Sequence, residues 1–395
     1  MRDGIDRRAM AALSGGHFAV DFASGSVPAL IPFLTDRFHL SYALAGLLLL
    51  ASTASSSLVQ PLFGLWSDRR GALWLIPGGT LLAAVGIAGA AVSPVYPLVT
   101  VLVFAGGLGV AAFHPEGAKF GAYASGRKRA SGMSYFNIGG NTGYALGAFV
   151  TGQLVDSLGL WAGTLAMVPV ALAGLGLLRL SPYLAGLASG STVAAASIDG
   201  EDDRRAMALL GGVIALRSIA WFTLLAFVPL WLVSLGHSKA DGNRLLFLML
   251  MSGAVGTLVL GPVADRVGLR RTLVVTQAAV PLLALTFVYV GGMVGALALM
   301  LVGVCVVGTF GVTMVLSQLY LPRHIGMASG LSVGLAMGIG GVAAVVLGAV
   351  ADSVDLKAAL TISAVAPVLG VVLSLRLPRP ASAVRPRREP AAAVD

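Results

Sequence analysis

Long apolar runs separated by short polar loops follow one another along almost the whole chain. A helix of about 20 residues crosses the hydrocarbon core of a membrane, and runs of that length recur about twelve times. Their approximate limits are 10–34, 42–66, 73–93, 95–118, 130–154, 159–180, 206–235, 245–264, 272–292, 294–320, 327–351 and 358–376. The pattern predicts an all-α membrane protein with about twelve transmembrane helices.

Composition supports this prediction and excludes a soluble protein. The 395-residue chain is 57% hydrophobic and 11% charged, whereas a soluble domain carries roughly 25% charged residues. The net charge of +9 does not indicate nucleic-acid binding, because the basic residues lie in short loops between the apolar runs. Lys and Arg are enriched in cytoplasmic loops, so we expect a multi-pass protein of the cell (inner) membrane with both termini in the cytoplasm.

A polar pattern occurs twice, in the loop after the second run and in the loop after the eighth. Each copy has a glycine followed four residues later by an Asp-Arg pair, and the two glycines, Gly64 and Gly261, lie 197 positions apart. Pro32 and Pro229 repeat at the same offset. The sequence therefore predicts two related halves, which is how many secondary transporters are built.

The expected domain boundaries follow from this repeat. Residues 1–180 and 206–376 would each form a six-helix bundle, joined by a polar cytoplasmic linker over 181–205 that is rich in Ser, Ala and Gly. Residues 377–395 are rich in proline and arginine. We expect them to form a basic cytoplasmic tail that contacts anionic membrane lipid.

The repeated motif resembles the signature loop of the major facilitator superfamily. Segments 16–21, 28–32, 112–117 and 136–143 further resemble the fosmidomycin-resistance type of drug exporter. The resemblance covers almost the whole chain. It implies two pseudo-symmetric six-helix bundles that work by alternating access, and proton-coupled efflux of small, often anionic, toxic compounds.

The resemblance also implies that the Asp-Arg loops act as a conformational latch. We expect each aspartate at a helix N-terminus, where the helix dipole stabilises it, and each arginine to bridge to the opposite bundle. Ordinary positive loop charge is the alternative. The latch residues are Gly64, Asp68, Arg69, Gly261, Asp265 and Arg266.

Four ionisable residues within the apolar runs are candidates for proton coupling. A charge there costs at least about 2.5–3.5 kcal/mol, so it marks a functional site. His17 and Asp21 share one helical face, and His114 and Glu116 stand near the end of the fourth run. We expect Asp21 to be the main proton carrier, while His17 could equally bond a neighbouring helix. His114 and Glu116, with no third ligand nearby, do not predict a metal site.

Arg217 is the only basic residue well inside an apolar run, and the 197-residue offset relates it to Val20, beside Asp21. We predict an Asp21–Arg217 pair that opens on protonation or on binding an anion, because a guanidinium fork binds both oxygens of a carboxylate or phosphonate. A static salt bridge is the alternative. Further candidates for substrate binding, which could instead serve helix packing, are Asn137, Asn141, Tyr135 and Trp221.

Gly139, Gly143 and Gly147 repeat every four residues in the fifth run and predict close helix packing. The resemblance implies that this ridge seals the two halves against proton leak.

Motifs of other functional classes are missing from the sequence. It has no Gly-x-x-x-x-Gly-Lys-Ser/Thr loop, so ATP does not drive the protein. We expect no enzyme activity, cofactor, metal or nucleic-acid partner. The predicted function is proton-coupled efflux of small organic, in part phosphonate-like, drugs or metabolites by a monomer. The alternative is a proton symporter that imports a small carboxylate or phosphonate.

Overall fold

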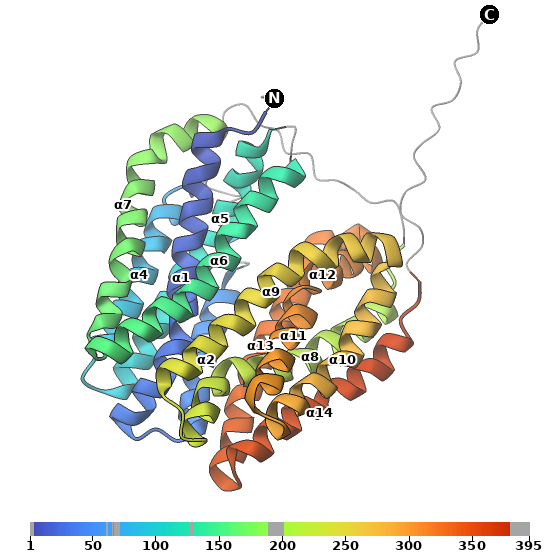
Figure 1. Ribbon diagram of the computed structural model, residues 1–395. Coiled ribbons are helices and arrows are strands. Elements are labelled where there is room, and N and C mark those ends of the chain that lie inside the picture. The colour runs from blue at the N-terminus through green and yellow to red at the C-terminus, as the bar shows by residue number, and fades with distance from the viewer. Residues whose placement is uncertain are drawn as a thin grey trace, which may run out of the picture.

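The computed structural model describes residues 4–60, 62–64, 66, 72–126, 129–188 and 201–379. Long helices form the first half of this part of the chain: α1 (Arg7–Phe38), α2 (Tyr42–Ser57), α4 (Leu75–Val92), α5 (Tyr96–Ser125), α6 (Arg129–Leu158) and α7 (Ala162–Ala188). The second half consists of α8 (Arg204–Ser234), α9 (Lys239–Val267), α10 (Leu269–Tyr289), α11 (Gly292–Val307), α12 (Phe310–Tyr320), the 3-10 turn η1 (Pro322–His324), α13 (Ile325–Ser353) and α14 (Leu356–Leu375). Figure 1 shows α1, α4, α5, α6 and α7 grouped on one side and α8 to α14 on the other.

The predicted membrane fold is confirmed. Within the described residues, 11 helical stretches are long and apolar enough to cross a membrane. The remaining long helix, α6, contains polar residues such as Asn137, Asn141 and Gln153 and packs along α1. It completes the first bundle.

Several spans differ from the predicted limits, α7 for example continuing to Ala188 rather than ending at 180, and two of these differences matter for the site. Helix α5 continues to Ser125, seven residues beyond the predicted end at 118, so His114 lies deeper in the bundle than expected. The tenth span is not one helix, because α11 ends at Val307 and α12 begins at Phe310. Gly308 and Thr309 form the break between them.

The two halves repeat each other in local structure. Asp6 caps α1 by accepting a hydrogen bond from the Ala9 N–H (3.0 Å), and Asp203 caps α8 through the Ala206 N–H (2.8 Å). Each aspartate also donates its own backbone N–H to a carbonyl at the end of α5 or α12. Asp6 and Asp203, like Ala9 and Ala206, are related by the 197-residue offset seen in the sequence.

The glycine ridge of α6 lies against the backbone of α1. A Cβ atom added at each of its glycines would collide with a carbonyl oxygen of α1. The pairs are Gly139 with Ser14, Gly143 with Phe18 and Gly147 with Phe22. The ridge therefore closes a seam within the first half, between α1 and α6.

Polar contacts between the two halves concentrate at the far face, where α1 turns into α2 and α13 into α14. The carboxylate of Asp352 on α13 accepts hydrogen bonds from the backbone N–H groups of Tyr42 (2.7 Å) and Ala43 (2.9 Å) at the start of α2. Lys239 of α9 forms an ion pair with Asp36 of α1. These contacts hold the halves together at the far face.

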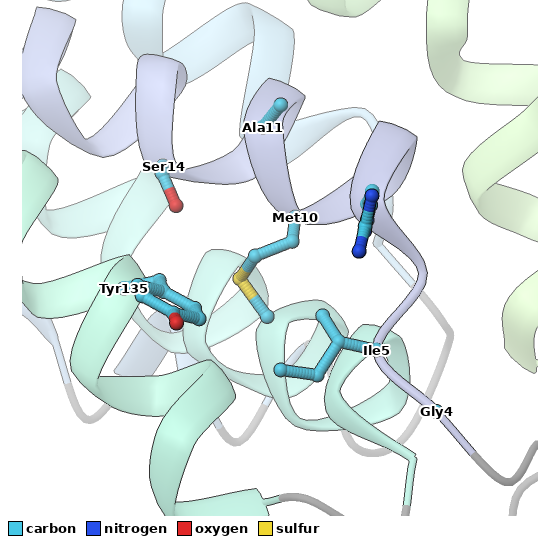
Figure 2. A pocket seen from close by; sticks show the side chains of 7 residues that line it. Gly4, Ile5, Met10, Ala11, Ser14 and Tyr135 are labelled. Atoms are coloured by element: carbon cyan, nitrogen blue, oxygen red, sulfur yellow. The ribbon is translucent and has the colours of Figure 1, made fainter.

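At the opposite, terminal face, where α1 and α8 begin, each half is hollowed beside its first helix. Figure 2 shows the first hollow, of about 640 Å³, between α1 and α6. It is lined by Gly4, Ile5, Arg7, Met10, Ala11, Ser14 and Tyr135. An equivalent hollow of about 780 Å³ lies beside α8, where Arg204 and Met207 occupy the positions of Arg7 and Met10. The repeat therefore extends to the surfaces at this face.

Candidate functional site

A cavity of about 450 Å³ lies between the two halves and is lined by both of them. Six of the residues singled out from the sequence line it: His17, Asp21, Asn137, Asn141, Arg217 and Trp221. Tyr135 instead lines the hollow between α1 and α6 (Figure 2) and is 57% exposed. The cavity also receives Tyr144 from α6, Phe222 from α8, Thr257 from α9 and Phe310 from α12.

Asp21 stands between two histidines on the first-half side of this cavity. Its Oδ2 is 3.3 Å from Nε2 of His17, one turn earlier on α1, and its Oδ1 is 3.3 Å from Nε2 of His114 on α5. The Asp21 side chain is only 18% exposed. We call these three residues the Asp21 cluster.

Backbone carbonyls fix the orientation of both imidazoles. Nδ1 of His17 lies 2.9 Å from the carbonyl oxygen of Phe136, and Nδ1 of His114 lies 2.8 Å from that of Val110. A carbonyl only accepts hydrogen bonds, so each Nδ1 carries a hydrogen. In a neutral imidazole the Nε2 that faces Asp21 is then a bare lone pair. A proton bound between Nε2 and the carboxylate turns their repulsion into a hydrogen bond.

Packing holds the cluster in place. The His17 ring stacks on Phe136, with ring centroids 4.1 Å apart, and on Phe113 at 6.0 Å. Gly140 of α6 lies directly over the polar atoms, since a Cβ atom there would come within 2.6 Å of Asp21 Oδ2. The absence of a side chain at Gly140 therefore leaves space for the cluster.

The prediction that His114 has no third potential metal ligand nearby is wrong. Nitrogen and oxygen atoms of His17, Asp21 and His114 lie within 4.8 Å of one another. Two imidazoles and a carboxylate are a donor set that suits divalent transition metals. The same atoms can bind either a proton or such an ion, so experiments on the cluster need a chelator control.

Arg217 lies on the opposite side of the cavity, and the predicted Asp21–Arg217 ion pair is not formed. The Arg217 side chain is buried, with the residue 3% exposed. Its Nη1 donates a hydrogen bond to Oγ1 of Thr309 (2.7 Å), while its Nε has no hydrogen-bond partner. The hydrogen-bond acceptor of the Arg217 guanidinium is therefore a neutral hydroxyl and not a carboxylate.

Thr309 stands in the break between α11 and α12. Its hydroxyl donates to the carbonyl of Cys305 (2.6 Å) and accepts from Arg217. Phe310 and Gly311, the first two residues of α12, line the cavity. No signal in the sequence marks this break, since Gly and Thr are tolerated within membrane helices.

Comparison with known proteins identifies the family. The model of the Major Facilitator Superfamily matches residues 13–345. This chain belongs to the major facilitator superfamily. The protein is therefore a multi-pass membrane transporter, and at the level of the family it is not an enzyme.

Two relatives place the chain within the superfamily. It is 30% identical over 372 residues to YfnC, an uncharacterized MFS-type transporter of Bacillus subtilis, covering 91% of this chain and 90% of YfnC. It is 27% identical over 375 residues to the fosmidomycin resistance protein of Escherichia coli, covering 93% and 92% of the two chains. The resemblance to the fosmidomycin-resistance type is thus confirmed as sequence similarity.

Solved structures of two other transporters share the fold. The nucleoside transporter NupG superposes with a TM-score of 0.74 at 14% identity, over 93% of this chain and 98% of NupG. A bacterial homologue of the human lysosomal transporter Spinster, inward-facing and unoccupied, gives 0.71 at 13% identity, over 95% and 96%. At such low identity the likeness shows the fold alone.

The superfamily signature loops are described only in part. Asp68 and Arg69 lie outside the described residues, and Gly64 ends a described stretch. Asp265 and Arg266 are exposed and belong to the last turns of α9, which ends before Gly268 (φ +103°). The expectation that Asp265 sits at a helix N-terminus is therefore wrong. Arg266 instead stands where the helix dipole favours a positive charge.

Glu116 lies apart from the Asp21 cluster. It is 1% exposed on α5, and its Oε2 is 3.5 Å from Nζ of Lys119. Neither residue lines the central cavity. The structure therefore separates Glu116 from His114, which the sequence had grouped together.

Proposed function

We propose that this transporter exchanges protons for small organic compounds, anionic ones among them, and exports them from the cell. The observation that carries the proposal is the Asp21 cluster, which places a carboxylate between two imidazoles at the wall of the central cavity. A membrane transporter driven by a proton gradient needs a group that gains and loses a proton within reach of the cargo. The Asp21 cluster has the chemistry and the position for that task.

The charge of the cluster depends on the protons it holds. With both Nε2 atoms unprotonated, lone pairs of His17 and His114 face the Asp21 carboxylate, and repulsion loosens the contact between α1 and α5. A bound proton turns one contact into a charge-assisted hydrogen bond and draws these helices together. Tyr144 of α6 and Arg217 of α8 are the other ionisable groups that line the cavity with the cluster.

The contacts between the halves support alternating access. Asp352 and Lys239 hold the far face together, while each half is hollowed at the terminal face. The distribution of Lys and Arg favours a cytoplasmic terminal face. We therefore interpret the structure as the state that is closed to the outside, and transport requires the far-face contacts to break.

Export is favoured over import by the similarity to a fosmidomycin resistance protein. Resistance to a toxic compound is readily explained when a transporter removes that compound from the cell. Proton symport, which would import a carboxylate or phosphonate, predicts that protons and cargo move in the same direction. The direction of proton flow thus separates the two functions.

The test uses purified protein in proteoliposomes with an imposed pH gradient and an internal pH dye. Fosmidomycin, a phosphonate, is the probe, and EDTA is present throughout to exclude a metal at the cluster. We expect the probe to drive protons in the opposite direction in the wild type. Asp21→Asn should lose this movement, while Asp156→Asn, a change of an exposed acid on α6, should retain it.

Each contrary result is informative. Proton movement in the same direction as the probe would establish symport. Coupling that persists in Asp21→Asn would exclude Asp21 as the carrier. Probe transport without proton movement in the wild type would contradict proton coupling.

A further inference from the structure

We propose that Arg217 and the first turn of α12 together form a binding subsite for the anionic head of the transported compound, and that this head is a tetrahedral oxyanion such as a phosphonate. The inference rests on the proposed function in one respect, that the central cavity receives the cargo. It concerns the side of the cavity opposite the Asp21 cluster.

The first reason is the environment of Arg217. A guanidinium inside a membrane-crossing helix is costly unless a counter-charge or several hydrogen bonds compensate it. The structure gives it one neutral acceptor, Oγ1 of Thr309, and leaves its Nε without a partner. None of the described carboxylates forms an ion pair with it. An anion entering the cavity that Arg217 lines would supply the missing charge.

The second reason is the start of α12. The first backbone N–H groups of a helix have no acceptor within that helix, and they favour anions. Thr309, the residue just before α12, gives this helix no side-chain cap, because its hydroxyl donates to Cys305 and accepts from Arg217 instead. The first turn therefore has donors available at the cavity wall, where Phe310 and Gly311 lie.

The third reason is access to this backbone. Gly311 is exposed, and a Cβ atom placed on it would meet no atom within 4 Å apart from those of its own helical turn. An oxyanion can therefore approach the first turn of α12 closely. A larger side chain at this position would fit the fold and cover the same donors.

These two features are adjacent because Thr309 belongs to both of them. It is the hydrogen-bond partner of Arg217 and the N-cap residue directly before α12. A phosphonate has three oxygens, enough to bind the guanidinium and the helix N–H groups together, whereas a carboxylate has two. Aromatic residues of the same cavity, Trp221 and Phe222, can contact the organic part of the compound.

The experiment measures equilibrium binding of fosmidomycin to purified protein without a pH gradient, so it does not depend on proton coupling. Arg217→Gln and Gly311→Val should each weaken binding, the first by about tenfold to a hundredfold, as expected for a lost hydrogen bond to a charged group. Arg376→Gln, which changes an exposed arginine at the end of α14, should leave the affinity unchanged. Methylphosphonate should displace the probe at a concentration at least about tenfold lower than acetate does.

The outcomes separate this inference from the proposed function. Binding that is equal in wild type, Arg217→Gln and Gly311→Val would overturn the subsite while leaving the cargo and coupling intact. Equal displacement by acetate would overturn the assignment of a tetrahedral head. Failure of the wild type to bind fosmidomycin and methylphosphonate would overturn the oxyanion subsite itself. Loss of proton coupling with normal binding would count against the proposed function alone.

Discussion

The first helices of the two halves carry opposite charges one position apart in the repeat, since Arg217 corresponds to Val20, the residue before Asp21. In α1, Asp21 turns toward His114 of α5 in the same half, and in α8, Arg217 turns toward Thr309 at the start of α12. Both charges line the same cavity. The repeat thus supplies one scaffold twice, and the side chains on it make one half acidic and the other basic. On the proposed function, one half binds the proton and the other binds the anion.

The seams beside these helices differ as well. Helix α6 packs its glycines against the backbone of α1, whereas a Cβ atom added at Gly340 of the equivalent helix α13 would meet the side chain of Phe222 on α8. Backbone therefore closes this seam in the first half, whereas an aromatic side chain fills the corresponding place in the second half.

The largest expected effect comes from closing space in the α1–α6 seam. In Gly143→Ala the new methyl group would collide with backbone atoms of Phe18, which cannot move aside as a side chain can. We expect destabilisation of about 3 kcal/mol or more and little folded protein. Size-exclusion profiles and thermal melting of the detergent-solubilised protein measure this. Gly338→Ala should behave like the wild type, because its new methyl group would lie near Leu58 alone, at 3.9 Å. Equal behaviour of the two variants would refute the steric importance of the α1–α6 seam.

The next effect is on the Asp21 cluster itself. In Gly140→Ala the methyl group would meet side-chain atoms of Asp21 and His17, which can shift. We therefore expect a folded protein whose substrate-driven proton movement falls by about tenfold or more, the range associated with positioned proton-transfer groups. Gly15→Ala is the control, because a Cβ atom there meets nothing within 4 Å. Normal coupling in Gly140→Ala would show that the cluster geometry is not critical.

A smaller effect is expected at the contact between the halves. Asp352→Asn replaces the charged acceptor of two α2 N–H groups, and a hydrogen bond to a charged group contributes about 1.5–3 kcal/mol. The population should shift toward states open at the far face. Distances between spin labels at Arg37→Cys and Val354→Cys, in a Cys305→Ala background, report this shift.

Asp355→Asn is the matched control for that measurement. Asp355 caps α14 within its own half by accepting from the Ala358 N–H (2.6 Å). Its loss should leave the label distances unchanged. An equal change in both variants would mean that Asp352 does not hold the halves together.

The smallest expected effect is on the unfolding free energy and comes from removing one hydroxyl in each half. Ser26 of α1 bonds Thr151 of α6 at 2.8 Å, whereas Thr223, its equivalent in α8, bonds only the carbonyl of Ile219 on its own helix. Hydrogen bonds between membrane helices contribute about 0.6 kcal/mol on average. Ser26→Ala should lower the unfolding free energy by that amount, and Thr223→Val should lower it less. A chemical denaturation series measures both, and a larger loss in Thr223→Val would contradict the comparison.

Much of the fold was predictable because each membrane span requires a long apolar run in the sequence. The limits of the spans were less accurate where a helix continues past charged residues. The predicted fourth run stops at 118, next to Lys119, although α5 continues to Ser125. His114 was therefore placed near the membrane surface and away from Asp21, which hid the Asp21 cluster.

The site was predictable residue by residue but not in its pairings. Asp21, His17 and Arg217 stand out in the sequence, because ionisable groups are costly within a membrane. Their partners depend on how each helix is rotated and on the break at Thr309. The periodicity of the sequence predicts neither of these features. The offset of 197 residues suggested an ion pair between the halves, but each charge is bonded within its own half.

The two sides of the contact between Asp352 and the start of α2 differ in their sensitivity to mutation. The donors are backbone N–H groups, which every residue except proline supplies at positions 42 and 43. The acceptor is a single carboxylate on α13. Substitutions at positions 42 and 43 other than proline therefore leave this contact chemically intact, whereas one change at position 352 removes its charge. A mutational survey of the first half without proline substitutions would not detect the contact.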